Sequence, residues 1–276
     1  MSKVAVVDLQ GENVQESFNQ ALKLIGSISD LNTAKRSVVV KVGVFDHRGT
    51  AYTTVDVAGA IVNSFSKAPK IFVAESDNYR GTGSERLQIW KSLFSERIVP
   101  FNLSEDTDTK EVDIAGEKIG LSHILFKPNV LVSSHILRVF EKGSVLKNLL
   151  GLTPDRKKAR FHRLGLERVL LDLYEAVGGV DLAVLDGTYA HGGVAPSAKK
   201  IVANVLLVGR DAVAVEAVGA SLVGMNPEKM PIIREAVKRG LGEGNIDEIK
   251  IVGASLESIR ERFAPLLKPK KRKKKA

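Results

Sequence analysis

Short runs of apolar residues alternate with segments of helical hydrophobic spacing along most of the chain. Ser37–Val44, Lys70–Ser76, Leu182–Asp186 and Ile201–Gly209 are nearly continuous apolar runs, which suit strands covered on both faces. Segments such as Leu166–Val177 carry apolar residues at helical spacing between these runs. The alternation predicts an α/β fold with a mainly parallel sheet flanked by helices.

Further elements complete this prediction. The remaining strands are expected at Val4–Asp8, Ile98–Leu103, Asn129–His135 and Ile249–Gly253, and the remaining helices at Asn13–Ile28, Thr54–Ser66, Glu85–Phe94, after Asp211, at Pro231–Arg239 and at Leu256–Ala264. Glu111–Leu121 alternates with period two about Ala115-Gly116, which predicts a β-hairpin insertion. We expect one α/β domain over residues 1–267, built as one lobe or two.

Polar loops follow four of the predicted strands. They begin after Val44, Ser76, His135 and Asp186, each at the carboxyl end of its strand. In open α/β sheets, ligands bind in the crevice at this edge. The loops are therefore the first place to look for a site.

The segment from Ser133 to His162 is the strongest functional candidate. It joins His135 at a strand end to Lys147 and Asn148 in an apolar run, and then to a basic stretch. That stretch holds Arg156, Lys157, Lys158, Arg160 and His162. Lys147, Asn148, Arg156 and His162 would hold a phosphate or carboxylate, and His135 would transfer protons.

Simpler interpretations of this segment stay open. A solvated basic loop accounts well for Lys157 and Lys158 but poorly for Lys147, which lies within an apolar run. His135 could equally be a core histidine whose ring is hydrogen-bonded by the backbone.

Two shorter motifs carry further candidates. Asp46 and His47, in the loop after Val44, could supply a general base and an anion contact, or could form a solvated turn. His191 and Gly192, followed by a second glycine, could bring backbone N–H groups close to an anion, or could form a surface turn.

Four carboxylates could gather near one sheet edge and bind Mg²⁺ through oxygen ligands. They are Glu75, Asp186, Asp211 and Glu216, and the favoured metal pair is Glu75 with Asp186. Each has a structural alternative: Glu75 and Asp186 as caps, Asp211 as the N-cap of the following helix, and Glu216 as a paired or exposed group.

The composition excludes several classes of chemistry. The chain has no cysteine, so it forms no disulfide and offers no thiolate to zinc, to an iron–sulfur cluster or to a substrate. We do not expect the opening residues to act as a signal peptide, and no apolar run approaches the ~20 residues that span a bilayer. We expect a cytoplasmic protein with no membrane partner.

The charge is concentrated at the carboxyl terminus. The net charge is +9, and seven of these charges lie in the last nine residues, which leaves +2 for residues 1–267. We expect residues 268–276 to be a disordered tail that binds RNA through its phosphates, the alternative being a solubilising tail. The candidate contacts are Lys270, Lys271, Arg272, Lys273, Lys274 and Lys275.

Several blocks of sequence, in order, resemble the family catalogued as domain of unknown function 362. They are Lys41 in an apolar strand, FVAESD, SSHILRVFEKGSVLKNLLGLTPDRKKARFH, LAVLDGTYAHGGVAPS, VLLVGRDAVAVEAVGASLVGMNP and GLGEGNIDEIKIVG. The chain departs from the family at Val42-Gly43, where proline-asparagine is usual, at Ser133, where lysine is common, and at Glu216, where aspartate is common. The resemblance implies an α/β fold with a pocket but no settled activity. Many relatives carry iron–sulfur modules, which a chain without cysteine cannot hold.

Two functions remain in competition. The first is binding, with or without transformation, of a small phosphate- or carboxylate-bearing molecule at the carboxyl edge of the sheet. The second is a nucleic-acid- or ribosome-associated protein that uses the tail and the basic stretch. A basic stretch that faces the cleft favours the first, and one that lies on a convex face favours the second.

Overall fold

The structure, a computed structural model, describes residues 1–9, 13–192 and 199–263 and is built on one large sheet. The strands are β1 (Lys3–Asp8), β2 (Val38–Val42), β3 (Ile71–Glu75), β4 (Ile98–Asn102), β5 (Thr109–Ile114), β6 (Glu117–Ser122), β7 (Val130–Arg138), β8 (Leu182–His191), β9 (Lys200–Gly209) and β10 (Lys250–Gly253). Eight of them form a sheet in the order β10-β1-β9-β8-β7-β2-β3-β4, and β5 and β6 form a separate hairpin. The predicted α/β class and the hairpin insertion are confirmed.

The sheet is mostly parallel. β2 pairs in parallel with β3 and β7, β3 with β4, β7 with β8, and β1 with β10. β9 is the exception, because it runs antiparallel to both β8 and β1. The four apolar runs predicted for one mainly parallel sheet all lie in it, and Ile201–Gly209 is the run that pairs antiparallel with its neighbours. A strand buried on both faces has the same sequence pattern in either direction.

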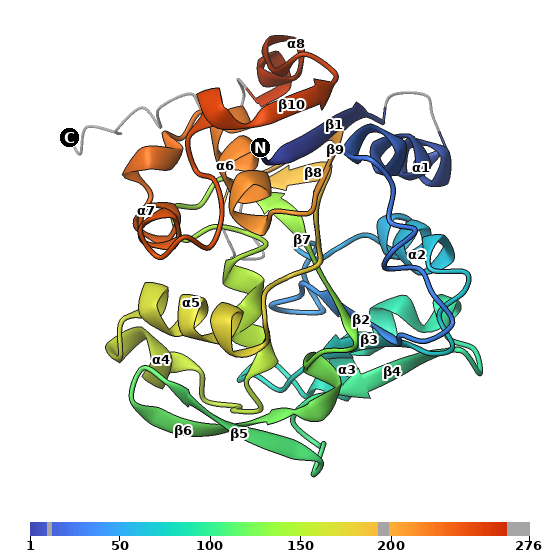
Figure 1. The fold of residues 1–276 in the computed structure, drawn as a ribbon, viewed down its shortest axis with the longest axis vertical. Helices are drawn as coiled ribbons and strands as arrows, with labels where there is room; N and C mark the ends of the chain where they lie inside the picture. The colour runs from blue at the N-terminus through green and yellow to red at the C-terminus, as the bar shows by residue number, and fades with distance from the viewer. Residues whose placement is uncertain (10–12, 193–198, 264–276) are drawn as a thin grey trace, which may run out of the picture.

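Helices cover both faces of the sheet. The α-helices are α1 (Val14–Ile25), α2 (Val55–Ser64), α3 (Gly83–Leu87), α4 (Ala159–Arg163), α5 (Leu166–Ala176), α6 (Ala212–Leu222), α7 (Pro231–Lys238) and α8 (Leu256–Arg260). Short 3-10 helices are η1 (Gln88–Leu93), η2 (His123–Leu125), η3 (Lys147–Leu152), η4 (Pro227–Lys229), η5 (Ile246–Glu248) and η6 (Glu261–Phe263). In Figure 1, α1 and α2 lie on one side of the sheet, and α5, α6 and α7 lie on the other.

Each face of the sheet has its own apolar core. The side of α1 and α2 buries Phe18, Ile61 and Trp90 against residues of the central strands. The opposite side buries the apolar faces of α5, α6 and α7, and the hairpin adds Ile114. Because both faces are covered, the central strands are buried along their whole length, which explains their continuous apolar sequences.

Local sequence signals set several element ends, and α1 ends at Ile25, three residues before the predicted end at Ile28. Asn13 caps α1 by accepting from the Gln15 amide, and Gly26 ends it in the left-handed conformation at φ 100°. The hairpin turns at Ala115 and Gly116, both with positive φ. The amide of Ala115 donates to the Asp172 carboxylate of α5 at 2.8 Å, which fastens the hairpin to the body.

Two further predicted elements differ more strongly in the structure. β8 continues to His191, where the sequence predicted a loop after Asp186. Small residues at Gly187 and Ala190 gave that stretch a loop-like composition, and a register shift between Gly187 and Tyr189 interrupts its pairing with β9. The helix predicted at Glu85–Phe94 is instead α3 followed by the tighter η1.

Among the described residues, none of the helices combines the length and the apolar composition that crossing a bilayer requires.

Candidate functional site

A cavity opens where the chain reverses its direction of travel across the sheet. From β2 the chain moves outward to β3 and β4, and it then returns to β7 on the other side of β2 before moving on to β8. Crossovers therefore leave β2 and β7 in opposite directions, and a crevice forms at their carboxyl ends. We call this the switch-point cavity; its volume is about 340 Å³. It is lined by Lys41, Val44, Phe45, Glu75, Asn78, Tyr79, Arg86, His135, Arg138, Phe140, Lys147, Asn148, Leu150, Gly151, Lys158, Ala159 and His162.

The lining combines cations with apolar side chains. Five lysines and arginines line the cavity, whereas Glu75 is the one carboxylate among the lining residues. Phe45, Phe140 and Leu150 supply apolar surface, and Tyr79, which is 64% exposed, lies edge-on to Phe45 with ring centroids 5.5 Å apart. Such a surface suits an anion with an apolar body.

A buried ionic cluster forms one wall. Lys41 on β2 is 1% exposed, and its Nζ lies 3.1 Å from Oε1 of Glu75. Arg86 on α3 is equally buried, and its Nη1 lies 3.4 Å from the other oxygen of Glu75. Burial lowers the pKa of Lys41, and the neighbouring Glu75 opposes that shift. The carboxylate of Glu75 is thus engaged by two cations.

Asn148 fastens η3 to the sheet. Its Oδ1 accepts from Lys41 Nζ at 3.0 Å, and its Nδ2 donates to the Lys41 carbonyl at 2.9 Å and to the Ser134 carbonyl at 3.1 Å. The side chain that the sequence assigned to an anion is therefore occupied by protein groups. It positions the wall of the cavity that carries Lys147.

Lys158 is placed differently from the solvated lysine that the sequence suggested. Its Nζ donates to Ser76 Oγ at 2.9 Å, to the Thr153 carbonyl at 2.7 Å and to Thr153 Oγ1 at 3.1 Å. Burial lowers the pKa of Lys158 to about 7. Its neighbour Lys157 is exposed, so the pattern of the basic stretch did not distinguish the two.

Three lining cations, Lys147, Arg138 and Lys158, form no ion pair with a carboxylate of the described residues, and Lys158 differs from the other two because three acceptors of Ser76 and Thr153 hold its amine. In contrast, Lys41 and Arg86 each form one. The Lys147 amine makes no hydrogen bond within the described part of the chain, and burial lowers its pKa to about 8. Arg138 is 5% exposed; its Nη2 donates to the Gly143 carbonyl at 3.0 Å, and its Nε is buried without a partner among the residues described.

His135 lies three residues before the end of β7 and is a neutral base. Burial lowers its pKa well below the usual value, with Arg138 the next cause. Its Nδ1 lies 2.9 Å from the Ile136 carbonyl, which can only accept, so Nδ1 carries the proton and Nε2 has a free lone pair. Gly43 makes room for the ring, since a Cβ there would lie 2.0 Å from His135 Cδ2. The departure from the family pattern at Val42-Gly43 thus coincides with this histidine.

The other predicted histidines divide between the cavity and its surroundings. His162 on α4 lines the cavity, and burial followed by the charge of Lys147 lowers its pKa. His191 is buried at the end of β8, opposite Arg138 in the strand register, with Nε2 unpartnered in the described structure. It is not among the lining residues, and neither is the exposed Gly192.

Asp46, His47 and Arg156 also lie outside the lining. Both carboxylate oxygens of Asp46 accept from Arg48, at 2.9 and 3.0 Å, and this bidentate pair lowers the pKa of Asp46 to about 2. An anion held in this way is a weak base, so Asp46 does not suit general base catalysis near neutral pH. Arg156 was expected to contact the anion but is exposed, and Lys158 from the same basic stretch lines the cavity in its place.

The metal pair expected from the sequence does not form. Glu75 is on β3 and Asp186 is on β8, and the strand order separates them by three spacings, about 14 Å. Asp186 instead accepts from the amide and hydroxyl of Thr54, both at 2.7 Å, which ties the start of α2 to β8. The described residues contain no group of three or more histidine, aspartate or glutamate side chains placed to share a metal ion.

Asp211 and Glu216 have structural partners. Asp211 caps α6 by accepting from the amides of Val213 and Ala214, which was the structural alternative to metal binding for this residue. Glu216 is 3% exposed on α6 and accepts from the amides of Ser144 and Leu146, at 2.8 and 2.9 Å. Its carboxylate therefore holds the loop between Arg138 and Lys147 in place.

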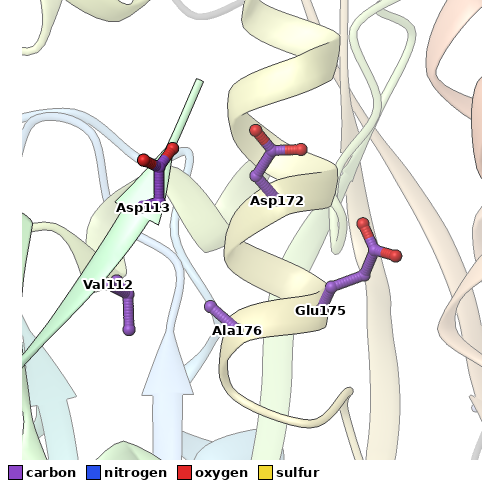
Figure 2. Close-up of a pocket in the computed structure, with 5 residues that line it drawn as sticks. All are labelled: Val112, Asp113, Asp172, Glu175 and Ala176. Carbon is purple, nitrogen blue, oxygen red and sulfur yellow. The ribbon is translucent and has the colours of Figure 1, made fainter. Parts of the chain in front are cut away.

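A second hollow lies between the hairpin and α5. Figure 2 shows Asp113, Asp172 and Glu175 around it. Arg239 bridges Asp172 and Glu175 at 2.7 and 2.9 Å, so two of these carboxylates are already paired. The residues that line this hollow include no lysine or arginine, in contrast to those of the switch-point cavity.

The basic tail is not part of the chain that the structure describes. Lys270, Lys271, Arg272, Lys273, Lys274 and Lys275 lie outside the described residues, as does the glycine after Gly192.

Fold and site together define an α/β protein with a cationic cavity at the switch point of its sheet. The chain matches the family model described as Domain of unknown function (DUF362) over residues 38–221, about two thirds of its length, and it belongs to that family. The matched stretch contains every residue that lines the switch-point cavity. No curated protein matches the chain.

Sequence reasoning missed several lining residues. Lys41 and Arg86 lie within a predicted strand and a predicted helix, where the apolar pattern gives no sign of a ligand contact. Arg138 lies beyond the predicted end of β7. Phe45 and Tyr79 follow strands in polar loops, where an aromatic side chain was the available signal. Four of these five residues lie within four positions of the carboxyl end of a strand. The fifth, Arg86, lies on α3 and reaches the same edge of the sheet from there.

Proposed function

We propose that this protein binds a small phosphate- or carboxylate-bearing molecule in the switch-point cavity, with Arg138 and Lys147 as the anion contacts. The observation that carries the proposal is the unpaired state of these two cations in a cavity whose one lining carboxylate is already engaged by Lys41 and Arg86. Arg138 is buried with the charge of Glu216 acting on it but no ion pair among the described residues, and Lys147 is half-buried. Burying a cation without an ion pair is costly, and a bound anion would reduce that cost.

The remaining lining residues support an anion with an apolar body. Phe45, Tyr79 and Phe140 offer aromatic surface, while His135 offers a neutral nitrogen that can accept a proton from a bound molecule. Proton transfer by His135 would make the site catalytic. Simple binding needs only the two cations and the apolar wall.

The basic stretch also favours the cavity over a nucleic-acid surface. Lys158 and His162 lie in the cavity lining, and Lys158 donates to groups of the body rather than to solvent. A phosphate-binding surface for RNA would instead need these cations on an exposed face.

Calorimetric titration with phenyl phosphate and benzoate tests the proposal, with benzyl alcohol as the neutral control. Lys147→Met should weaken binding of the anions by ~1.5–3 kcal/mol, or roughly 10- to 150-fold, the scale for a hydrogen bond to a charged group. Lys157→Met removes an exposed lysine of the same basic stretch and should change nothing. Equal affinity in the wild type and Lys147→Met would contradict the assignment.

A further inference from the structure

The three lysines of the switch-point cavity differ in what their amines contact. Lys41 Nζ is held by the Val42 carbonyl at 2.9 Å, by Asn148 and by Glu75. Lys158 Nζ is held by three acceptors of Ser76 and Thr153. An ammonium group has three protons to donate, so protein groups fill the hydrogen-bonding capacity of both amines. Lys147 is the lysine of this set whose amine has no such partner in the described structure.

The surroundings of Lys147 favour a neutral, nucleophilic amine. Leu150 and Phe140 line the same cavity, and the charges of Arg138 and Lys142 act on Lys147 in addition to burial. A lysine that is desolvated and placed beside another cation becomes a nucleophile near neutral pH. With a pKa of about 8, about a tenth of the amine is neutral at pH 7, far more than for an exposed lysine.

We propose that Lys147 forms an imine with a small aldehyde or ketone that also carries a carboxylate or phosphate. This inference rests on the proposed function, because Arg138 would hold the anionic group while the carbonyl carbon meets Lys147. The Nζ lone pair attacks the carbonyl carbon, both amine protons are transferred to the carbonyl oxygen, and that oxygen leaves as water. His135 and His162 line the cavity and supply nitrogens through which those protons can move.

Pyridoxal 5′-phosphate is a suitable probe because it joins an aldehyde, a phosphate and an aromatic ring. The full chain is incubated with the probe at pH 7, reduced with borohydride and mapped by peptide mass spectrometry. 4-Deoxypyridoxine 5′-phosphate has the same ring and phosphate without the aldehyde, so it measures anion binding alone. Lys147→Arg keeps the positive charge but removes the amine, and Lys142→Arg is the matched control from the same loop.

We expect the reduced adduct to form at Lys147 roughly tenfold faster than at the exposed Lys157, with a rate that rises through about pH 8. The deoxy analogue should suppress the adduct, Lys147→Arg should abolish it, and Lys142→Arg should retain it. Binding of the deoxy analogue without any adduct at Lys147, or an adduct at Lys41 or Lys158 instead, would overturn the imine and leave the proposed function standing. If the deoxy analogue does not bind at all, the proposed function fails together with this inference.

Discussion

At the scale of single residues, burial and hydrogen bonding decide which cations of this protein are available to a ligand. Lys157 and Lys158 are adjacent in sequence, yet the first is exposed and the second donates to three acceptors of the body. Lys147 was predictable because a lysine within an apolar run is unusual. The inward position of Lys158 was not predictable, since a run of consecutive basic residues does not indicate which side chain points into the protein.

The pH dependence of stability tests the burial of Lys158. Its pKa in the folded protein is about 7 against an ordinary 10.5, so between these values the unfolded chain binds more protons. The free energy of unfolding should therefore rise with pH across that window. Lys158→Met should flatten the rise in urea unfolding experiments, and Lys157→Met should leave it unchanged. Equal slopes for the two variants would show that Lys158 titrates as an exposed lysine.

At the scale of elements, hydrophobic patterning predicted where strands and helices lie better than it predicted how strands pair. The four apolar runs became β2, β3, β8 and β9 of one sheet. The antiparallel direction of β9 depends on the connection from β8, which contains no helix among its described residues. Arg138 escaped prediction for a related reason, because β7 continues three residues beyond His135.

Gly43 links β2 to the histidine of β7, and its replacement tests that contact. A Cβ at position 43 would lie 2.0 Å from His135 Cδ2, so Gly43→Ala should displace the ring or the strand and destabilise the protein by ~1–3 kcal/mol. At Gly49 the nearest atom to a new Cβ is 3.4 Å away, so Gly49→Ala should cost less than ~0.5 kcal/mol. Thermal unfolding of both variants makes the comparison, and similar losses would refute the close approach at Gly43.

Glu216 on α6 holds the loop that connects the two proposed anion contacts. Its carboxylate accepts from the amides of Ser144 and Leu146, and an amide in its place offers a single acceptor oxygen. Glu216→Gln should therefore reduce the free energy of unfolding by ~1–3 kcal/mol and also weaken phenyl phosphate binding. The exposed Glu111→Gln is the control for the loss of one negative charge. Unchanged ligand affinity in Glu216→Gln would mean that the loop keeps its position without this carboxylate.

At the scale of the whole molecule, the site follows from topology. β2 and β7 are neighbours in the sheet, although Val38 and Val130, which stand in register at the start of their pairing, are 92 positions apart in the chain. The sequence predicted a ligand edge from polar loops after strands, and the structure brings His135, Lys147 and His162 to one cavity at that edge. The structure also separates Glu75 from Asp186. The sequence could not predict this separation, because the order of strands along the chain does not reveal their order in the sheet.

The tail provides a test that is independent of the cavity. Truncation after Leu267 removes seven cations and should leave thermal unfolding and phenyl phosphate binding unchanged. If the tail binds single-stranded RNA through ~4–6 phosphates, log affinity of the full chain should fall with log salt at a slope of roughly −3 to −4, and truncation should abolish binding. Filter binding across a salt series measures both. The same slope in the truncated chain would assign RNA binding to the body instead.

The central claim is that Arg138 and Lys147 hold an anion inside the switch-point cavity. A crystal structure with 4-bromobenzoate tests it most directly, because anomalous scattering from bromine locates the ligand without reference to the protein map. We predict the carboxylate between the Arg138 guanidinium and the Lys147 amine, with the bromophenyl ring against the apolar wall of Phe45 and Phe140. Bromine found only beside exposed cations, with the cavity empty at a saturating concentration of ligand, would contradict the account.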